Sequence, residues 1–347
     1  MPRAAATQTA GREGKREAEP EMRTPHAGSR SRSSRRCPRV GSRALVRVCW
    51  HGGPSFSLDL AGTVVLVDPA FSKPGDYPPW FDDKCVNPHA PTVEEFLTVH
   101  RPDYVFITHG HFDHFDLRTV ERLAAALRAP IVGSEAVVRT CREVLGLDEE
   151  RLLACPEPRD SLDRAFEAPA APAAEASRLW EDLAPGVRFR PVPGAHWFTG
   201  PEGDRVAAKL AGRPERYGVM PCGGPMLGFV FAVDTPRGGR ELTVYVSGDT
   251  EFGSFPEGPF DAAVVSCGGM LMNPSTRRVE GPFLDEAHLA RAASETLKAG
   301  VLVPVHYDHP VFLTPFDIEK LRAELRTYPR APRLLVPTYG NWETLLA

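Results

Sequence analysis

The chain has 347 residues, of which 42% are hydrophobic and 25% are charged. This length fits one large or two small domains, and this composition excludes a wholly disordered or fibrous chain. The formal net charge of −4 combines +7 on residues 1–43 with −11 on the remainder. A broad nucleic-acid surface needs clustered Lys and Arg, so the acidic remainder argues against nucleic acid as a partner.

Residues 1–43 are rich in Arg, Ser, Gly and Ala and contain almost no large apolar side chains, which predicts a disordered basic tail. They also lack the apolar segment of a secretory signal. No run of about 18 apolar residues occurs in the chain, so we expect no membrane span. The seven cysteines are scattered without a C-x-x-C pair. They indicate free thiols and, with the missing signal, a cytoplasmic location.

The hydrophobic pattern then predicts one α/β domain over residues 44–347. Its first half is expected to contain three short strands, a strand that ends at a cluster of histidines, and a helix–strand–helix unit: Ala44–Cys49, Phe56–Leu60, Thr63–Val67, Tyr104–Thr108, Asp116–Arg128, Ile131–Val132 and Ser134–Leu145. A Pro-, Ala- and Glu-rich stretch at residues 156–177 is predicted to be an inserted loop.

The second half repeats this order of strands before helices. Four strands, a helix, a buried strand, a helix and a last strand are expected at Val187–Val192, Leu227–Val233, Leu242–Ser247, Ala262–Ser266, Asp285–Ala299, Val301–Val305, Asp317–Arg326 and Leu334–Val336. Strands followed by helices in both halves predict two β-sheets sandwiched between helices, which is an αββα architecture.

One segment, Thr108-His109-Gly110-His111-Phe112-Asp113-His114, directly follows an apolar strand. Imidazoles and carboxylates are costly to bury unless they are paired or bind a metal. Alternation along an extended loop lets His109 and His111 point the same way, and Asp113 and His114 can reach a second position nearby. Zinc accepts such nitrogen and oxygen ligands, and two ions held close together suit hydrolysis by a shared hydroxide.

Three more candidate ligands lie where apolar strands end. His196 follows Val192 by four residues, Asp249 follows the strand that ends at Ser247, and His306 ends the run Val301–Val305. Functional side chains are commonly presented by loops at strand ends. The sequence therefore offers enough ligands for a dinuclear site.

This set of residues resembles the metallo-β-lactamase superfamily. The chain matches its H-x-H-x-D-H motif at residues 109–114 and its later ligands, and the similarity extends from about Leu45 to the C-terminus. The resemblance implies an αββα fold with two mixed sheets. It further implies that the first metal is held by His109, His111 and His196, the second metal by Asp113, His114 and His306, and both by a bridging Asp249. Asp68 matches an aspartate that orients a metal ligand in this family.

Within the superfamily, the chain is most similar to the branch of ascorbate-6-phosphate lactonase and N-acylphosphatidylethanolamine phospholipase D. The similarity rests on Trp50, Gly52, Ser55-Phe56, Asp68-Pro69, Gly194–Trp197, Ser247–Thr250, Phe260-Asp261 and Pro304–Tyr307. That branch has a histidine two residues before the Ser-Phe pair, where this chain has Gly53, and His51 is displaced by two positions. We expect a rearranged contact there.

Other side chains near the motifs have two interpretations. His309, three residues after His306, is interpreted either as a general acid or substrate contact, or as a solvated loop residue. Trp197, Phe198 and Tyr307 fit either a pocket wall or ordinary core packing. The remaining histidines are expected to be bystanders, and these are His26, His89, His100 and His288.

These observations predict a dinuclear metal-dependent hydrolase that cleaves an ester, lactone or phosphodiester of a small molecule, with Asp113, Asp249 and His309 as catalytic residues. The expected cofactors are two divalent ions, zinc in the first place, with manganese or iron open. Three alternatives are a nuclease of the same fold, an iron-dependent redox or biosynthetic enzyme, and a non-catalytic member. A homo-oligomer is left open.

Overall fold

The computed structural model describes residues 45–76, 86–155, 180–194, 226–236, 239–272, 279–280, 284–310 and 312–347. These residues belong to one compact unit, Arg43–Ala347. The basic tail predicted at residues 1–43 and the insertion loop predicted at residues 156–177 lie outside the described residues, and both stay predictions.

The first sheet has the strand order β16-β1-β2-β3-β4-β5-β6. Its members are β1 (Val46–Gly52), β2 (Ser55–Leu60), β3 (Thr63–Val67), β4 (Tyr104–Phe106), β5 (Ile131–Ser134), β6 (Leu152–Cys155) and β16 (Trp342–Leu346). Strands β16 to β3 pair antiparallel, and β3 to β6 pair parallel. The sheet is therefore mixed.

The second sheet has the order β15-β14-β11-β10-β9-β8-β7. Its members are β7 (Glu181–Ala184), β8 (Val187–Pro193), β9 (Leu227–Val233), β10 (Leu242–Val246), β11 (Ala262–Ser266), β14 (Val301–Val305) and β15 (Arg333–Leu334). Strands β7 to β10 are antiparallel, and β10 to β15 are parallel. A small pair, β12 (Leu271–Met272) and β13 (Val279–Glu280), stands apart from both sheets.

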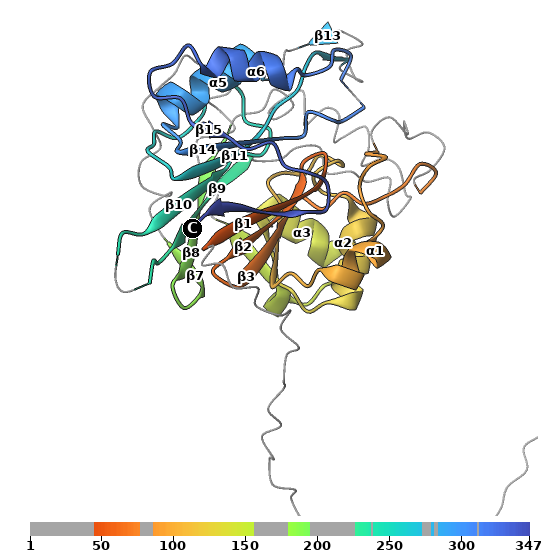
Figure 1. Ribbon diagram of the computed structural model, residues 1–347. Coiled ribbons are helices and arrows are strands. Elements are labelled where there is room, and N and C mark those ends of the chain that lie inside the picture. The colour runs from red at the N-terminus through yellow and green to blue at the C-terminus, as the bar shows by residue number, and fades with distance from the viewer. Residues whose placement is uncertain are drawn as a thin grey trace, which may run out of the picture. The chain divides into compact units, whose positions relative to one another are not determined.

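Helices cover the outer face of each sheet (Figure 1). Helices α1 (Val93–Val99), α2 (Leu117–Ala126) and α3 (Glu135–Glu143) pack on the first sheet. Helix α5 (Glu286–Arg291), which continues as a π-helical turn over Ala292–Thr296, and α6 (Ile318–Leu325) pack on the second. Side chains that accept hydrogen bonds from backbone amides cap their N-termini, at Thr92, Asp116, Ser134, Asp285 and Asp317.

The largest apolar cluster lies between the two sheets. In β1, Val46, Val48 and Trp50 point into this layer, as the two-residue period of a strand requires. Phe106 of β4 is surrounded by aromatic rings of β8 and β9, and its ring centroid lies 5.0 Å from those of Phe189, Phe229 and Phe231. The layers are thus helix, sheet, sheet and helix, as the sequence predicts.

Six α-helices and β-strands were not predicted, namely α1, β6, β7, β12, β13 and β16. Strands β6 and β7 lie at sheet edges. Half of the four residues of β6 are exposed, so its sequence lacks a strong apolar run. Helix α1 buries only Val93 and Phe96. Its sequence signal was the capping box, in which Thr92 and Glu95 bond each other's backbone amides.

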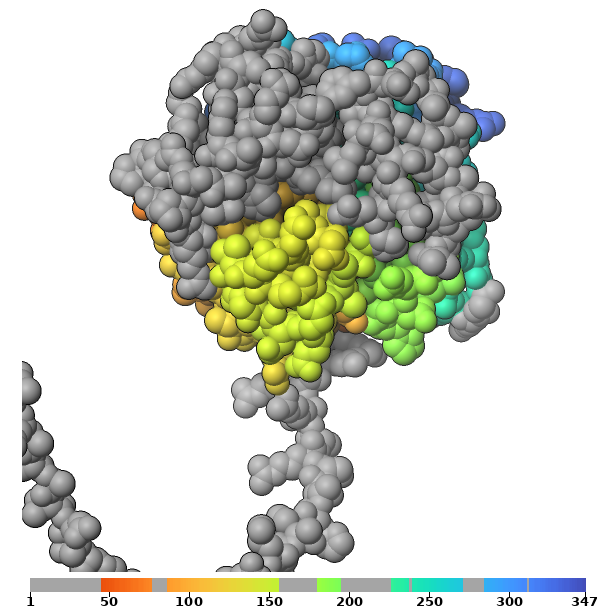
Figure 2. Space-filling view, turned by 180° about the vertical axis from the view of Figure 1, so that it is seen from behind, coloured from red at the N-terminus to blue at the C-terminus, as the bar shows by residue number. Residues whose placement is uncertain are grey.

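The first and second sheets also meet at the surface of the molecule. Seen from behind, the surface of the α3 region borders that of β7 and β8 (Figure 2). The hydroxyl of Tyr104 in β4 donates a hydrogen bond to the carbonyl of Leu183 in β7, at 2.7 Å. Among the described residues, no helix is both long and apolar enough to cross a lipid bilayer.

Candidate metal centre

The candidate ligands gather where the parallel strands of both sheets end. Strand β4 leads to Thr108, and β14 leads to His306. The amide of Leu227 donates to the carbonyl of Thr108 at 3.0 Å, and the amide of His306 donates to the carbonyl of Gly53 at 2.9 Å. These bonds join the first sheet to the second at this edge, so ligands from both halves of the chain meet there.

The loop after β4 supplies four of the candidate ligands. Nε2 of His109 lies 2.9 Å from Nδ1 of His111, and the planes of the two rings are inclined by 74°. The amides of His114 and Phe115 both donate to the carbonyl of His111, at 3.0 and 2.6 Å. This tight turn carries Asp113 and His114 past the first pair and into the start of α2.

Two groups of three metal-ligating side chains result. One consists of His109, His111 and Asp249, and the other of Asp113, His114 and His306; within each group the ligand atoms lie within 4.8 Å of one another. The first group joins two residues of the first expected set, His109 and His111, with the expected bridging residue Asp249, and the second group has the members of the second expected set. His196, the remaining expected ligand, lies outside the described residues.

Asp249 belongs to the first group and also lies close to the second. Its Oδ1 lies 3.1 Å from Nε2 of His114 and 4.0 Å from Nε2 of His306. Within the second group, Nε2 of His306 lies 3.2 Å from Oδ2 of Asp113. A carboxylate in this place can contact a cation in either group, as a bridging ligand must.

Asp68 fixes the orientation of His114. Its Oδ2 lies 2.7 Å from Nδ1 of His114, and its two oxygens accept hydrogen bonds from the amide and hydroxyl of Thr108, both at 2.7 Å. With Nδ1 engaged by the carboxylate, Nε2 of His114 faces Asp249 and is available to a metal. A carboxylate behind a ligating imidazole is a common arrangement in metal sites.

The backbone at the centre adopts unusual conformations. Asp68 and His306 have φ values of +46° and +74°, in the left-handed region that non-glycine residues rarely adopt. Gly248, just before Asp249, has a φ of +55°. Such backbone conformations persist where surrounding contacts impose them. Here they direct the side chains of Asp68, His306 and Asp249 towards the centre.

Charges of opposite sign stabilise each other in the centre. Burial disfavours the imidazolium of His114, but the carboxylates of Asp249, Asp68 and Asp113 outweigh it and raise the pKa of His114 well above its usual range. Burial also disfavours the carboxylate of Asp113, but the neighbouring imidazoles hold its pKa well below its usual range. The carboxylates thus favour a positive charge at this point, and a divalent cation fits this donor set.

His309 lies at the rim of the same centre. It is 3% exposed, and its Nε2 lies 3.9 Å from Oδ2 of Asp113. Burial lowers the pKa of His309 to about 4. The interpretation of His309 as a solvated loop residue is therefore wrong. Together with Asp113, Phe112 and Ser72, it lines a small hollow in the described surface.

A partly buried network that the sequence did not predict holds the loop of His306 and His309. The carboxylate of Asp308 accepts hydrogen bonds from the amide of Gly53 at 3.0 Å, from the side-chain amide of Asn87 at 2.9 Å and from the hydroxyl of Tyr339 at 2.7 Å. Gly53 thus makes a backbone contact with this loop, and the rearranged contact expected there stays a prediction. Only the position of Asp308 between two histidines could have indicated it.

Other residues considered from the sequence lie elsewhere. Tyr307 packs against the cores on both sides of the second sheet, and its ring centroid lies 5.2 Å from that of Trp50. His51 and His100 lie on the side of β1 that faces α1, and they belong to neither ligand group. Trp197 and Phe198 lie outside the described residues.

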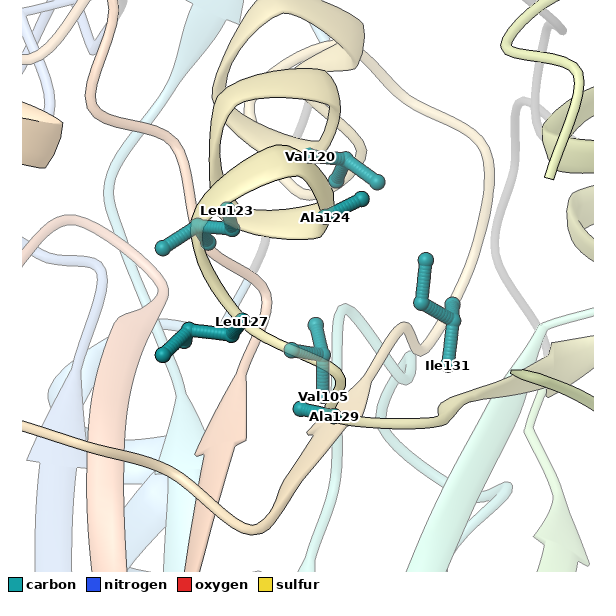
Figure 3. A pocket seen from close by; sticks show the side chains of 7 residues that line it. All are labelled: Val105, Val120, Leu123, Ala124, Leu127, Ala129 and Ile131. Atoms are coloured by element: carbon teal, nitrogen blue, oxygen red, sulfur yellow. The ribbon is translucent and has the colours of Figure 1, made fainter.

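A second hollow lies beneath α2 and has no polar lining. Its walls are the side chains of Val105, Val120, Leu123, Ala124, Leu127, Ala129 and Ile131 (Figure 3). Binding sites combine an apolar wall with a few placed polar groups. This hollow is therefore a packing defect of the helix–sheet interface and carries no chemistry.

Comparison with known proteins agrees with this architecture. Residues 47–166 match the family model described as a beta-lactamase superfamily domain. A UPF0173 metal-dependent hydrolase from Pyrobaculum aerophilum is 30% identical over 89 residues, which are 26% of this chain and 32% of that protein. The chain thus matches about a third of the length of this relative.

Solved structures match over more of the chain. An isothiocyanate hydrolase from Delia radicum gut bacteria superposes with a TM-score of 0.56 at 16% identity, covering 87% of this chain and 100% of that one. A metallo hydrolase from Ignicoccus hospitalis superposes with a TM-score of 0.52 at 17% identity, covering 86% and 97%. Together with the family match, they confirm that the chain has the metallo-β-lactamase fold.

Proposed function

We propose that this metallo-β-lactamase-fold protein is a metal-dependent hydrolase of a small molecule that uses two divalent ions, with zinc as the first choice. The observation that carries the proposal is the pair of three-residue ligand groups with Asp249 beside both. The names of the Pyrobaculum relative and of both solved structures include hydrolase, which supports the reaction class.

The ligands would divide between the ions as the resemblance to the metallo-β-lactamase superfamily implies. His109, His111 and His196 would hold the first ion, and Asp249 would contact both. The second ion would be held by Asp113, His114 and His306, which form one of the two groups of neighbouring ligand atoms. When bound, the two ions would supply Lewis-acid activation of a water molecule and of the substrate's electrophilic oxygen.

Other side chains of the centre would orient a ligand or contact the substrate. Asp68 and Thr108 would hold the ring of His114 in one orientation. His309 would contact the substrate from the rim, because its ring lines the hollow beside Asp113. As a neutral imidazole it can accept or donate a hydrogen bond near the reacting group.

An ester, lactone or phosphodiester is the proposed substrate class, in line with the resemblance to the lactonase and phospholipase D branch. A nuclease activity is disfavoured because residues 44–347 carry a net charge of −11. A polyanionic nucleic acid would be repelled by such a body unless a basic surface offset it. The other alternative, iron-dependent redox chemistry, differs from hydrolysis in the metal that the site would select.

Metal content by elemental mass spectrometry tests the proposal. Wild type, Asp113→Ala and Asp249→Ala would be compared with Asp148→Ala, whose exposed side chain makes no capping hydrogen bond. We expect about two equivalents of zinc or manganese in wild type and control, and fewer in both site variants. Hydrolysis of p-nitrophenyl acetate, a γ-lactone and bis-p-nitrophenyl phosphate would then be measured. No metal after reconstitution would refute the proposal, and two equivalents of iron would favour redox chemistry.

A further inference from the structure

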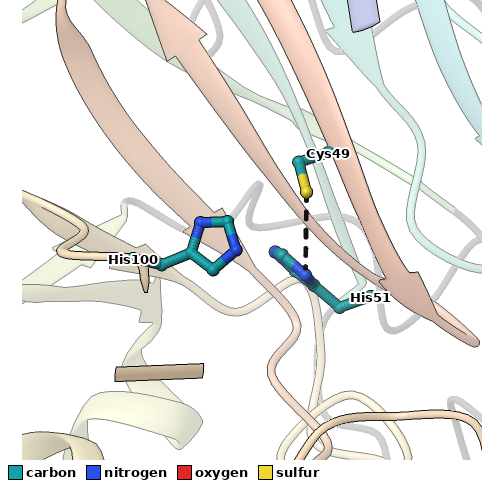
Figure 4. A group of neighbouring side chains, drawn as sticks. All are labelled: Cys49, His51 and His100. Atoms are coloured by element: carbon teal, nitrogen blue, oxygen red, sulfur yellow. Dashed lines mark hydrogen bonds between the residues drawn. The ribbon is translucent and has the colours of Figure 1, made fainter. Parts of the chain in front are cut away.

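A third cluster of potential metal ligands lies away from the strand ends, beneath α1. Because side chains alternate along β1, Val48 and Trp50 face the second sheet, while Cys49 and His51 face the helices. His100, at the C-terminal end of α1, completes the cluster from the helix side (Figure 4). None of the three belongs to the ligand groups of the metal centre.

The three side chains present their ligand atoms to one another. Sγ of Cys49 lies 4.0 Å from Nδ1 of His51, and one ligand atom from each of the three residues lies within 4.8 Å of the others. Nε2 of His51 lies 2.8 Å from the hydroxyl of Ser57. This contact engages the far nitrogen of the ring and leaves Nδ1 for the cluster.

The ring of His100 is held in place by its own helix. Its amide donates to the carbonyl of Phe96 at 2.9 Å, and its ring stacks on that of Phe96, with centroids 4.8 Å apart and planes inclined by 20°. Two further aromatic rings border the cluster. The ring centroid of Phe71 lies 6.0 Å from that of His51, and that of Trp342 lies 5.8 Å from that of His100. The cluster is therefore preorganised inside an apolar shell.

Burial keeps all three ligands uncharged when nothing is bound. It lowers the pKa of His51 to about 3 and also lowers that of His100, so both imidazoles keep a free electron pair at neutral pH. Burial raises the pKa of the Cys49 thiol to about 12, while Arg47 and Glu343 act on it in opposite directions. A thiophilic cation would displace the thiol proton to solvent as the sulfur–metal bond forms.

We propose that Cys49, His51 and His100 form a binding site for a monovalent soft cation, Cu(I). One thiolate and two neutral imidazoles carry a charge of −1, so a monovalent ion leaves the buried site neutral. A divalent ion would leave a net positive charge in an apolar shell, which is costly. Three soft or borderline ligands also suit Cu(I), whereas structural zinc sites use four ligands.

Binding there would join α1 to the first sheet. Cys49 and His51 lie on β1, and His100 ends α1, so the ion would link two elements whose side chains already pack together, with the ring centroids of His51 and Phe96 5.1 Å apart. A ligand that binds only the folded state raises its stability. Cu(I) loading is therefore expected to raise the unfolding temperature, independently of the proposed hydrolase centre.

An anaerobic Cu(I) titration of the full-length protein tests the site, after its hydrolase centre has been filled with zinc. Bicinchoninate would report free Cu(I). The variants are Cys49→Ser, His100→Phe, which keeps a stacked ring beside Phe96, and the control Cys141→Ser, a buried thiol on α3. We expect wild type and control to bind about one equivalent more than the two site variants.

A spectroscopic measurement keeps the test decisive if a variant fails to fold. The copper K-edge spectrum of the wild type should show one sulfur and two nitrogen neighbours. Equal Cu(I) binding by wild type, Cys49→Ser and His100→Phe would overturn the proposal, as would a wild-type copper shell without sulfur. Binding of zinc in preference to Cu(I) at this cluster would overturn the assignment of a monovalent ion.

Discussion

Asp68 and His114 are joined by a contact of 2.7 Å between Oδ2 and Nδ1, while the opposite nitrogen of the same ring lies 3.1 Å from Asp249. Asp68 thus holds the imidazole at Nδ1, and Nε2 faces Asp249. Because both side chains are almost fully buried, no solvent competes with this contact. The orientation of His114 therefore depends on Asp68.

Replacing Asp68 with Asn should weaken metal binding without removing a ligand. The amide keeps the shape of the carboxylate but loses its charge, so we expect the affinity for the second ion to fall by about 10–100-fold. Competition with a chromophoric zinc chelator measures this affinity. Asp103→Asn is the control, because the carboxylate of Asp103 also accepts a hydrogen bond from a backbone amide, that of Val64 in β3, but lies at the surface. Equal affinities in the two variants would contradict the proposed role.

Gly248 is expected to tolerate no side chain. A Cβ there would lie 2.8 Å from Cβ of Thr108 and 2.7 Å from Cε of Met226, at a φ of +55°. Met226 can move, but Thr108 is fixed by its bonds to Asp68. Gly248→Ala should lower the free energy of unfolding by about 2–4 kcal/mol, the sum of a left-handed residue and overpacking.

Gly146 provides the matched control for that substitution. It has a φ of +67°, and a Cβ there would meet nothing within 4 Å. Gly146→Ala should therefore show only the conformational cost, about 1 kcal/mol. Urea unfolding of both variants separates the two contributions, and equal losses would mean that crowding at Gly248 has no effect.

Much of the architecture could be predicted because the central strands are continuous apolar runs. Strand β9 is buried at every position, and its predicted bounds, Leu227–Val233, agree with the structure. The motif at residues 109–114 was equally visible, because its residue types are costly to bury in a core. Local sequence sufficed in both cases.

The contacts that were missed depend on register between distant segments. Asn87 bonds Asp308 across 221 positions, and His100 meets His51 only because α1 lies over β1. Such contacts between distant residues cannot be predicted from a single sequence. The displacement of His51 from the family position was visible, but its place on the outer face follows from the strand register, which shifts between Trp50 and Gly52.

The packing of α2 on the first sheet can be tested at Leu123. This side chain is 2% exposed and lines the apolar hollow beneath the helix. Leu123→Ala would enlarge an existing void, so we expect a loss of about 3–5 kcal/mol in the free energy of unfolding. Leu153→Ala is the control, because Leu153 on β6 is 37% exposed. A similar loss in both variants would show that the helix repacks to fill the space.

Asp261 should make the stability of the second sheet depend on pH. Its carboxylate accepts a hydrogen bond from the amide of Thr243 at 2.8 Å and pairs with Arg240. Burial disfavours the charged form, but these partners outweigh it and lower the pKa of Asp261. A group whose pKa is lower in the folded state stabilises the fold above its unfolded pKa, and this contribution is lost as the pH falls through the folded pKa.

Asp261→Asn should therefore be less stable than wild type by about 1–2 kcal/mol at neutral pH, because the charge-assisted bonds are lost and Arg240 is largely exposed. The difference should shrink as the pH falls through the lowered pKa of Asp261, because protonation removes the same bonds from the wild type. Urea unfolding across this pH range measures it, with the exposed Asp148→Asn as the control. A difference that stays constant down to the lowest pH would show that Asp261 acts through shape and not through its charge.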